Sequence, residues 1–238
     1  MDYKLILNIL LVAIVVICAW SGYKKGLIMG IGRVIIIIIS LFGANLLSNT
    51  FSYEVIPVLR PFASGYMEKQ MNETVSDDMG ITDAGLSVED YLLKNPDEAE
   101  EFCYRSYQAL GIYEAEARDL AQQAVEYADE QDVSVREAVT EVLCTGITYA
   151  SGFILAFLLI LIVLTVIGNL PNLSFKIPHL DIVNDIGGTL IGVFTGVMFC
   201  AVIAWALQYS GIIFKEEVLT ESGPISWFLN WGLLNRYI

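Results

Sequence analysis

Long apolar runs on either side of a polar stretch divide the chain into two kinds of sequence. Four runs reach about 20 residues, the length at which a helix crosses the hydrocarbon core of a bilayer. They cover residues 5–22, 27–47, 149–168 and 187–209, and Arg33 is the only charged residue within them. A helix satisfies its own backbone hydrogen bonds in lipid. The pattern therefore predicts an all-α, polytopic membrane protein with four transmembrane helices.

Helix-start signals recur in the polar stretch between the second and third runs, residues 48–147. Ser87 precedes two acidic residues, as an N-cap does. The sequence Asn95-Pro96-Asp97-Glu98 combines a capping residue, a proline suited to the first helical position and an acid that can bond back. The sequence Ser134-Val135-Arg136-Glu137 has the spacing of a capping box and starts a helix that runs into the third apolar run. We expect a helical insert.

Two apolar stripes at helical spacing support this prediction. The first stripe contains Ala99, Phe102, Cys103, Tyr107 and Leu110. Gly111 follows it and is expected to end that helix. The second stripe contains Tyr113, Ala117, Leu120, Ala121, Ala124 and Ala128. The acids expected mostly on the opposite, solvated face of the second helix are Glu114, Glu116, Asp119, Glu126 and Asp129.

The chain is thus expected to have four parts. Residues 1–47 hold spans one and two, and residues 48–147 form the acidic insert. Residues 148–211 hold spans three and four with the loop between them, and residues 212–238 form an amphipathic interfacial tail.

Charge separates the insert from the rest of the chain. The whole chain has a net charge of −14, yet its mean hydropathy is +0.60. The insert carries 21 acidic and 6 basic residues, whereas the remaining 138 residues carry 6 and 7. A nucleic-acid binder needs clustered lysines and arginines, so this class is excluded. Apolar side chains recur throughout the insert, which excludes a disordered acidic tail.

The basic residues near the apolar runs indicate the orientation. They fall into two groups: Lys24, Lys25, Arg33 and Lys176 on one side, and Lys4, Lys215 and Arg236 on the other. Short loops with more lysine and arginine stay in the cytoplasm. Lys24 and Lys25 are adjacent in a very short turn, so we place the two short loops inside and both termini and residues 48–147 outside. Arg33 is close enough to the turn to reach the cytoplasmic headgroups.

Catalytic chemistry leaves no clear mark in this sequence. The single histidine, His179, has no cysteine or glutamate at metal-ligand spacing, and no nucleotide-binding, hydrolase or zinc-protease motif is present. A pair of catalytic carboxylates in the acidic insert remains an alternative, although no motif marks one. Cys103 and Cys144 could pair, although Cys103 on an apolar stripe is more typical of a small buried hydrophobe. We expect no enzyme activity, no metal and no cofactor.

Two series of glycines repeat at every fourth residue. Gly22, Gly26 and Gly30 lie at the end of the first apolar run and the start of the second. Gly188, Gly192 and Gly196 open the fourth run. On a membrane helix this spacing makes a stripe without side chains, against which another backbone can pack closely. We predict that these six glycines pack helices together.

These glycines, with their neighbours, give the chain a resemblance to a known family. The sequence Gly22-Tyr-Lys-Lys25-Gly26 and the stretch from Asn184 to Gly196 are similar to those of the CvpA (colicin V production) proteins of the bacterial cytoplasmic membrane. The sequence Ser222-Gly-Pro-Ile225 and the aromatic tail that follows it also resemble that family. The resemblance covers the four runs and the tail and does not include the insert. It implies involvement in bacteriocin production or export and in envelope homeostasis.

Some family-like polar positions differ from the family pattern. Asn8 stands where an aspartate typically opens the first span, and Asp185, next to the family-like Asn184, stands where an arginine is usual. Thr195 replaces a residue that is often basic. These changes remove charges from the membrane part and leave the packing glycines in place.

Two functions therefore compete, with a third behind them. The first is a non-enzymatic envelope protein whose partners are the lipid bilayer and other membrane proteins or further copies of itself. Its tail would be anchored at the outer surface by Phe228, Trp231 and Leu234. The second is a small channel or transporter, lined by Asn8, Arg33, Ser40, Asn45 and Thr165. The third makes the insert a binding module for peptide or wall material.

Overall fold

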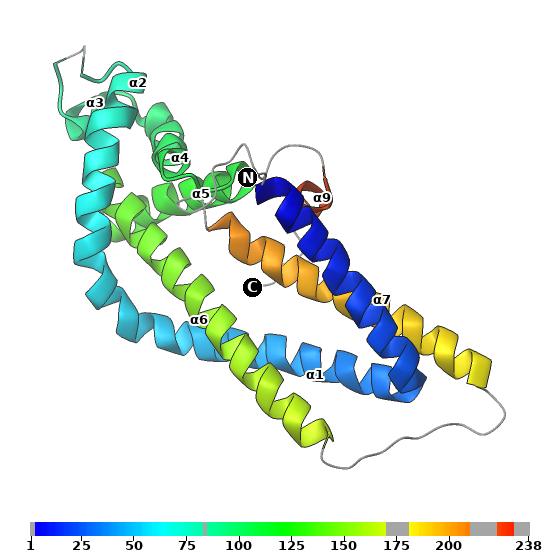
Figure 1. Cartoon of the computed structure of the whole chain (residues 1–238). Helices are drawn as coiled ribbons and strands as arrows, with labels where there is room; N and C mark the ends of the chain where they lie inside the picture. The colour runs from blue at the N-terminus through cyan, green and yellow to red at the C-terminus, as the bar shows by residue number, and fades with distance from the viewer. Residues whose placement is uncertain (1–2, 83–84, 170–180, 210–222, 231–238) are drawn as a thin grey trace. The chain divides into compact units, whose positions relative to one another are not determined.

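The computed structural model describes residues 3–82, 85–169, 181–209 and 223–230. Within these ranges the chain forms helices and no strand, which confirms the all-helical prediction for them (Figure 1). Residues 1–49, 151–207 and 217–238 form one compact unit, the membrane unit, and residues 50–150 and 208–216 form a second, the helical unit. The predicted loop residues Lys176 and His179 lie outside the described residues.

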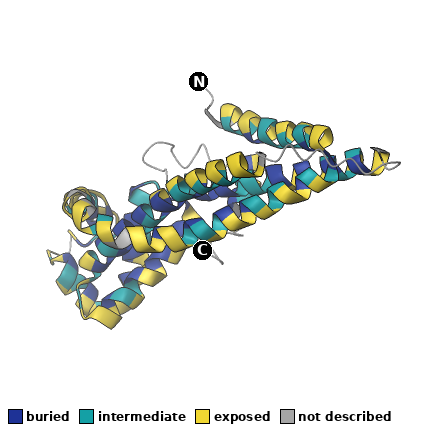
Figure 2. Ribbon diagram, turned by 90° about the horizontal axis from the view of Figure 1, so that it is seen from below, coloured by how far each residue is buried: buried dark blue, intermediate teal, exposed yellow. Residues whose placement is uncertain are grey.

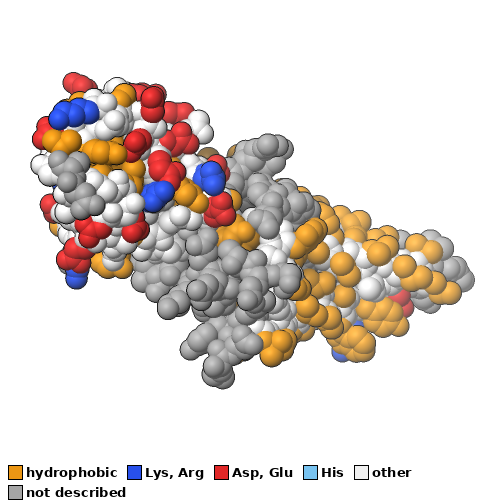
Figure 3. All heavy atoms as spheres, turned by 90° about the horizontal axis from the view of Figure 1, so that it is seen from above, with side chains coloured by type: hydrophobic (Ala, Val, Ile, Leu, Met, Phe, Trp, Pro, Cys, Tyr) orange, Lys and Arg blue, Asp and Glu red, His pale blue; other side chains and the backbone are white. Residues whose placement is uncertain are grey.

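The membrane unit is built from long apolar helices. Its part of α1 (Tyr3–Gln70) is joined by parts of α6 (Val135–Asn169) and α7 (Asp181–Gln208), and by the short α9 (Pro224–Asn230). Among the residues that the structure describes, three stretches are long and apolar enough to cross a membrane: Leu5–Phe51, Val135–Gly168 and Ile182–Gln208. Figure 3 shows hydrophobic side chains over the visible face of these helices. Such a surface suits lipid as its solvent.

α1 is interrupted once within the membrane unit. Gly26 has a φ of 79° and a ψ of 177°, outside the helical range, and divides α1 into two helical segments. We predicted a very short turn around Lys24 and Lys25, but both lysines are helical and only Gly26 breaks the helix. Gly22 and Gly30 therefore lie on different segments and do not form one continuous stripe.

α6 and α7 meet through aromatic rings. The ring of Phe153 packs edge-on against that of Trp205 with centroids 5.1 Å apart, and the rings of Phe157 and Phe199 meet at 6.2 Å. Trp205 is buried at this contact. α7 begins at Asp181, six residues before the apolar run that we predicted as the fourth span.

The helical unit contains shorter amphipathic helices. After α1 come η1 (Met71–Val75), α2 (Ser76–Asp78), α3 (Val88–Lys94), η2 (Pro96–Glu98), α4 (Ala99–Ala109) and α5 (Glu114–Gln131). Their buried faces turn inward, as Figure 2 shows in dark blue. Both predicted stripes are buried, which confirms them. The residues at the centre of this core with almost no exposed surface include Phe102, Cys103, Tyr107, Ala117, Ala121, Ala124 and Val139.

Helix ends in this unit follow local chemistry. Ser87 Oγ accepts a hydrogen bond from the backbone N–H of Asp90, and Ser134 Oγ accepts one from that of Glu137, which confirms both N-caps. Gly111 ends α4 with a φ of 77°. The side chain of Asn95 does not cap the helix that follows it. Its Nδ2 instead donates to the carbonyl oxygen of Tyr91, at the end of α3.

Candidate functional site

Five of the six predicted packing glycines lie where helix backbones or a polar side chain leave no room for a side chain. All six glycines are buried. A Cβ atom on Gly22 would meet the carbonyl oxygen of Gly188. One on Gly192 would lie 2.9 Å from Cα of Ala19, and one on Gly196 would lie 2.8 Å from Cα of Val15. We call this contact between the first segment of α1 and α7 the glycine seam.

The break at Gly26 is closed by Asn184. The backbone N–H of Leu27, the first residue after the break, donates to Asn184 Oδ1 at 2.9 Å. A helix leaves its first N–H groups without partners, so this side chain acts as an N-cap supplied by another helix. A Cβ on Gly26 would lie 2.7 Å from Asn184 Cγ, and the positive φ of Gly26 also favours glycine. Gly30 is looser, because its nearest neighbour is the side chain of Ile191.

Asn8 has the same role at α9. Its Oδ1 accepts a hydrogen bond from the backbone N–H of Ile225 at 3.1 Å. α9 then buries Ile225 and Leu229 and leaves Trp227 exposed, so one face of this helix packs on the unit. The sequence singled out Asn8 and Asn184 without showing that both are caps, since an N-cap is normally sought next to the helix that it caps. Of the expected tail anchors, Trp231 and Leu234 lie outside the described residues.

Three basic residues surround the break at Gly26. Lys24 and Lys25 are exposed, and Arg33 is partly buried in the second segment of α1. Lys24 Nζ lies 5.3 Å from the centre of the Trp20 ring, within range of a cation–π interaction. No charge of opposite sign forms an ion pair with these three residues within the described part of the chain.

The residues expected to line a channel have other environments. Asn8 Oδ1 accepts the α9 hydrogen bond, and Ser40 Oγ donates to the carbonyl oxygen of Ile36 in its own helix. Asn45 Oδ1 accepts a hydrogen bond from Asn49 Nδ2, and Thr165 is exposed on α6. The contacts of Asn8, Ser40 and Asn45 are explained by helix geometry and give no support to a common polar route.

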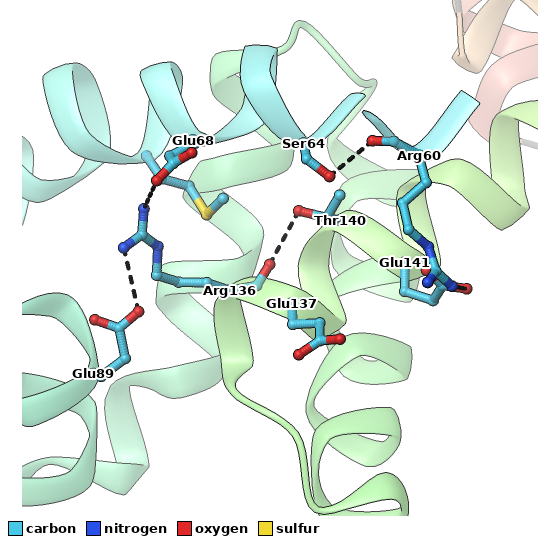
Figure 4. Close-up of a pocket in the computed structure, with 9 residues that line it drawn as sticks. Arg60, Ser64, Glu68, Glu89, Arg136, Glu137, Thr140 and Glu141 are labelled. Carbon is cyan, nitrogen blue, oxygen red and sulfur yellow. Dashed lines mark hydrogen bonds and ion pairs between the residues drawn. The ribbon is translucent and has the colours of Figure 1, made fainter. Parts of the chain in front are cut away.

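The helical unit has a polar pocket of about 360 Å³ between α1, α3 and α6 (Figure 4). Its charged lining consists of Arg60, Glu68, Glu89, Arg136, Glu137 and Glu141. Arg60 Nη2 contacts Glu141 Oε1 at 2.6 Å. This hydrogen bond raises the pKa of Arg60 above its ordinary value. Arg136 contacts Glu89 at 3.2 Å and Glu68 at 3.7 Å, so it links three helices. Both arginines of the pocket are therefore engaged in ion pairs that hold the helices of this unit together.

One acid differs from the prediction for α5. Glu116, which we expected mostly on the solvated face, is buried. It accepts a hydrogen bond from the hydroxyl of Tyr209. Tyr209, which we placed at the end of the fourth span, belongs to the helical unit and packs against its core. The partner of Glu116 lies 93 residues away, so helical periodicity could not identify it.

The two cysteines of the helical unit are free and buried. Burial raises the pKa of the Cys103 thiol to about 12. The thiolate is the reactive form of cysteine, so this thiol is unreactive at neutral pH. Within the described ranges no group of three histidine, cysteine or acidic side chains has the arrangement of a metal site.

Comparison with known proteins finds a family model that matches this chain. The model of the colicin V production protein family matches residues 117–232. This range contains Asn184 and the α7 glycines and also part of the insert, whereas Asn8 and Gly22 to Gly30 lie before it. No curated protein and no solved structure matches the chain. The family match confirms the resemblance drawn from the sequence and supports the assignment of this membrane protein to the CvpA family.

Proposed function

We propose that this protein is a non-enzymatic integral protein of the bacterial cytoplasmic membrane that takes part in the production or export of colicin V-type toxins and in envelope homeostasis. The family match over residues 117–232 carries this proposal. The glycine seam supports the membrane part of the proposal, because close packing at small residues is typical of membrane helix bundles. Its partners would be other membrane proteins or further copies of itself.

The proposal includes four spans. The apolar stretch Leu5–Phe51 has 47 residues, and a straight helix of that length would measure about 70 Å. The hydrocarbon core is only about 30 Å thick. The break at Gly26 divides the stretch into two segments that each match the core. Two spans from α1 and one each from α6 and α7 keep the insert and both termini on the outer side.

Cysteine labelling tests this topology. Asp129 is exposed on α5, so the Asp129→Cys variant should react with a membrane-impermeant maleimide in intact cells. Lys24→Cys is the matched control and should react only after the membrane is permeabilised. Labelling of position 24 and not of position 129 in intact cells would show the opposite orientation.

Complementation tests the function. In a colicin V-producing strain that lacks its own CvpA-family protein, expression of this chain should restore the secreted toxin activity and normal tolerance of detergent. The amount of protein in the membrane fraction is measured in the same cells. If the protein is present at a normal level and toxin activity stays at that of the deletion strain, the proposed function is wrong.

A further inference from the structure

The described charges of the membrane unit are concentrated on one short stretch of chain. Three basic side chains, Lys24, Lys25 and Arg33, lie within ten positions of one another on α1. Asp185 on α7, next to Asn184, is the one acid of this unit whose side chain the structure describes. The region therefore has an excess of positive charge in an otherwise apolar surface.

No ion pair within the described part of the chain neutralises these three charges. Arg33 lies six positions after Leu27, which corresponds to about 9 Å along the helix from the break. A charged side chain at such a depth needs a partner, because an unpaired charge in hydrocarbon is costly. The long side chain of Arg33 can extend back toward the break, where Lys24 and Lys25 are exposed.

Aromatic rings mark this end of the first segment as the headgroup level. Trp20 and Tyr23 are 62% and 49% exposed, and their ring centres lie 6.2 Å apart. Tryptophan and tyrosine favour the boundary between headgroups and acyl chains. The ammonium group of Lys24 lies over the Trp20 ring. The exposed side chains of Ile17 and Ile28 continue the apolar surface on either side.

We propose that Lys24, Lys25 and Arg33, with Trp20 and Tyr23, bind the headgroup phosphate of an anionic phospholipid. The positive charges complement the phosphate, and the adjoining isoleucines suit acyl chains. A soluble anion or an acidic protein segment has no acyl chains, so a phospholipid fits both features. Clusters of basic residues at the cytoplasmic end of membrane helices attract anionic lipids in this way. The inference depends on the proposed membrane topology, because these residues must face the headgroups.

Native mass spectrometry of the full-length protein in detergent tests this site. Phosphatidylglycerol should bind more tightly than phosphatidylcholine of the same chain length, and inorganic phosphate should not displace it. Each of Lys24→Gln, Lys25→Gln and Arg33→Gln should weaken phosphatidylglycerol binding about fivefold. Binding of phosphatidylcholine should not change.

Two further variants keep this test specific. The charge-conserving triple variant Lys24→Arg, Lys25→Arg, Arg33→Lys should retain binding. The double variant Arg105→Gln, Arg118→Gln removes two charges from the helical unit, where each pairs with a glutamate one turn away, and it should bind as the wild type does. Equal binding of both lipids, or unchanged phosphatidylglycerol binding by all three single glutamine variants, would overturn the site. Labelling at Lys24→Cys reports the topology separately, so failure of the topology and failure of the site are distinguishable.

Discussion

Gly192→Leu is expected to destabilise the membrane unit by about 3 kcal/mol or more, at the upper end of the effects of overpacking. A Cβ at this position already meets the backbone carbonyl oxygen of Cys18 and lies 2.9 Å from Cα of Ala19. Backbone atoms cannot rotate away as a flexible side chain can, so the helices must separate. The measurement is the temperature at which the purified protein in detergent loses its monodisperse peak in size-exclusion chromatography.

Gly32→Leu is the matched control for this variant. Gly32 is exposed on the second segment of α1, and a Cβ there would have nothing within 4 Å. Leucine also has a higher helix propensity than glycine, so this variant should be at least as stable as the wild type. If Gly192→Leu keeps the melting temperature of the wild type, close packing at the glycine seam contributes little to stability.

Tyr107→Ala should have the largest effect in the helical unit, with a loss of about 3–5 kcal/mol, as for other large aromatic side chains removed from a core. The ring of Tyr107 is fully buried, and its hydroxyl donates to the carbonyl oxygen of Val139 at 3.0 Å. Tyr107→Phe keeps the ring and should cost about 0.5–1.5 kcal/mol, because it removes one buried hydrogen bond to a carbonyl that stays bonded within α6. Hydrogen exchange of α4 and α5 amides in the full-length protein measures both changes.

Leu93→Ala provides the reference for the helical unit. Leu93 is 81% exposed on α3, so its truncation should change stability by less than about 0.5 kcal/mol. Equal exchange rates in Tyr107→Ala and Leu93→Ala would mean that the described core does not determine the stability of this unit.

Features that depend on neighbouring residues could be predicted from the sequence. Ser87, Ser134 and Gly111 act on helix ends within four positions of themselves, and the stripe through Phe102 and Tyr107 repeats with the period of the helix itself. In each case the physical cause and its effect lie in the same short segment. The apolar runs were predictable for the same reason.

Features that depend on distant partners could not be predicted. The family-like Asn8 and Asn184 were identified as polar positions, but their cap partners are 217 and 157 positions away. Glu116 has the sequence environment of a solvated acid, and only a tyrosine from beyond α7 makes it a buried one. Asn95 was assigned to the wrong helix, since the same residue can serve the end of one helix or the start of the next.

The long sequence separation between the two partners of each asparagine cap delays the formation of these caps during synthesis. The N–H of Leu27 is made early, but its acceptor on Asn184 exists only after 157 more residues have been added, and Asn8 waits for Ile225. Until then the first two helical segments must remain in the membrane with this junction open. Partly assembled chains that expose such unpaired surfaces are the species that chaperones and proteases recognise. The nascent chain is thus most vulnerable to quality control until both Asn184 and Ile225 have been made, because only then can both caps form.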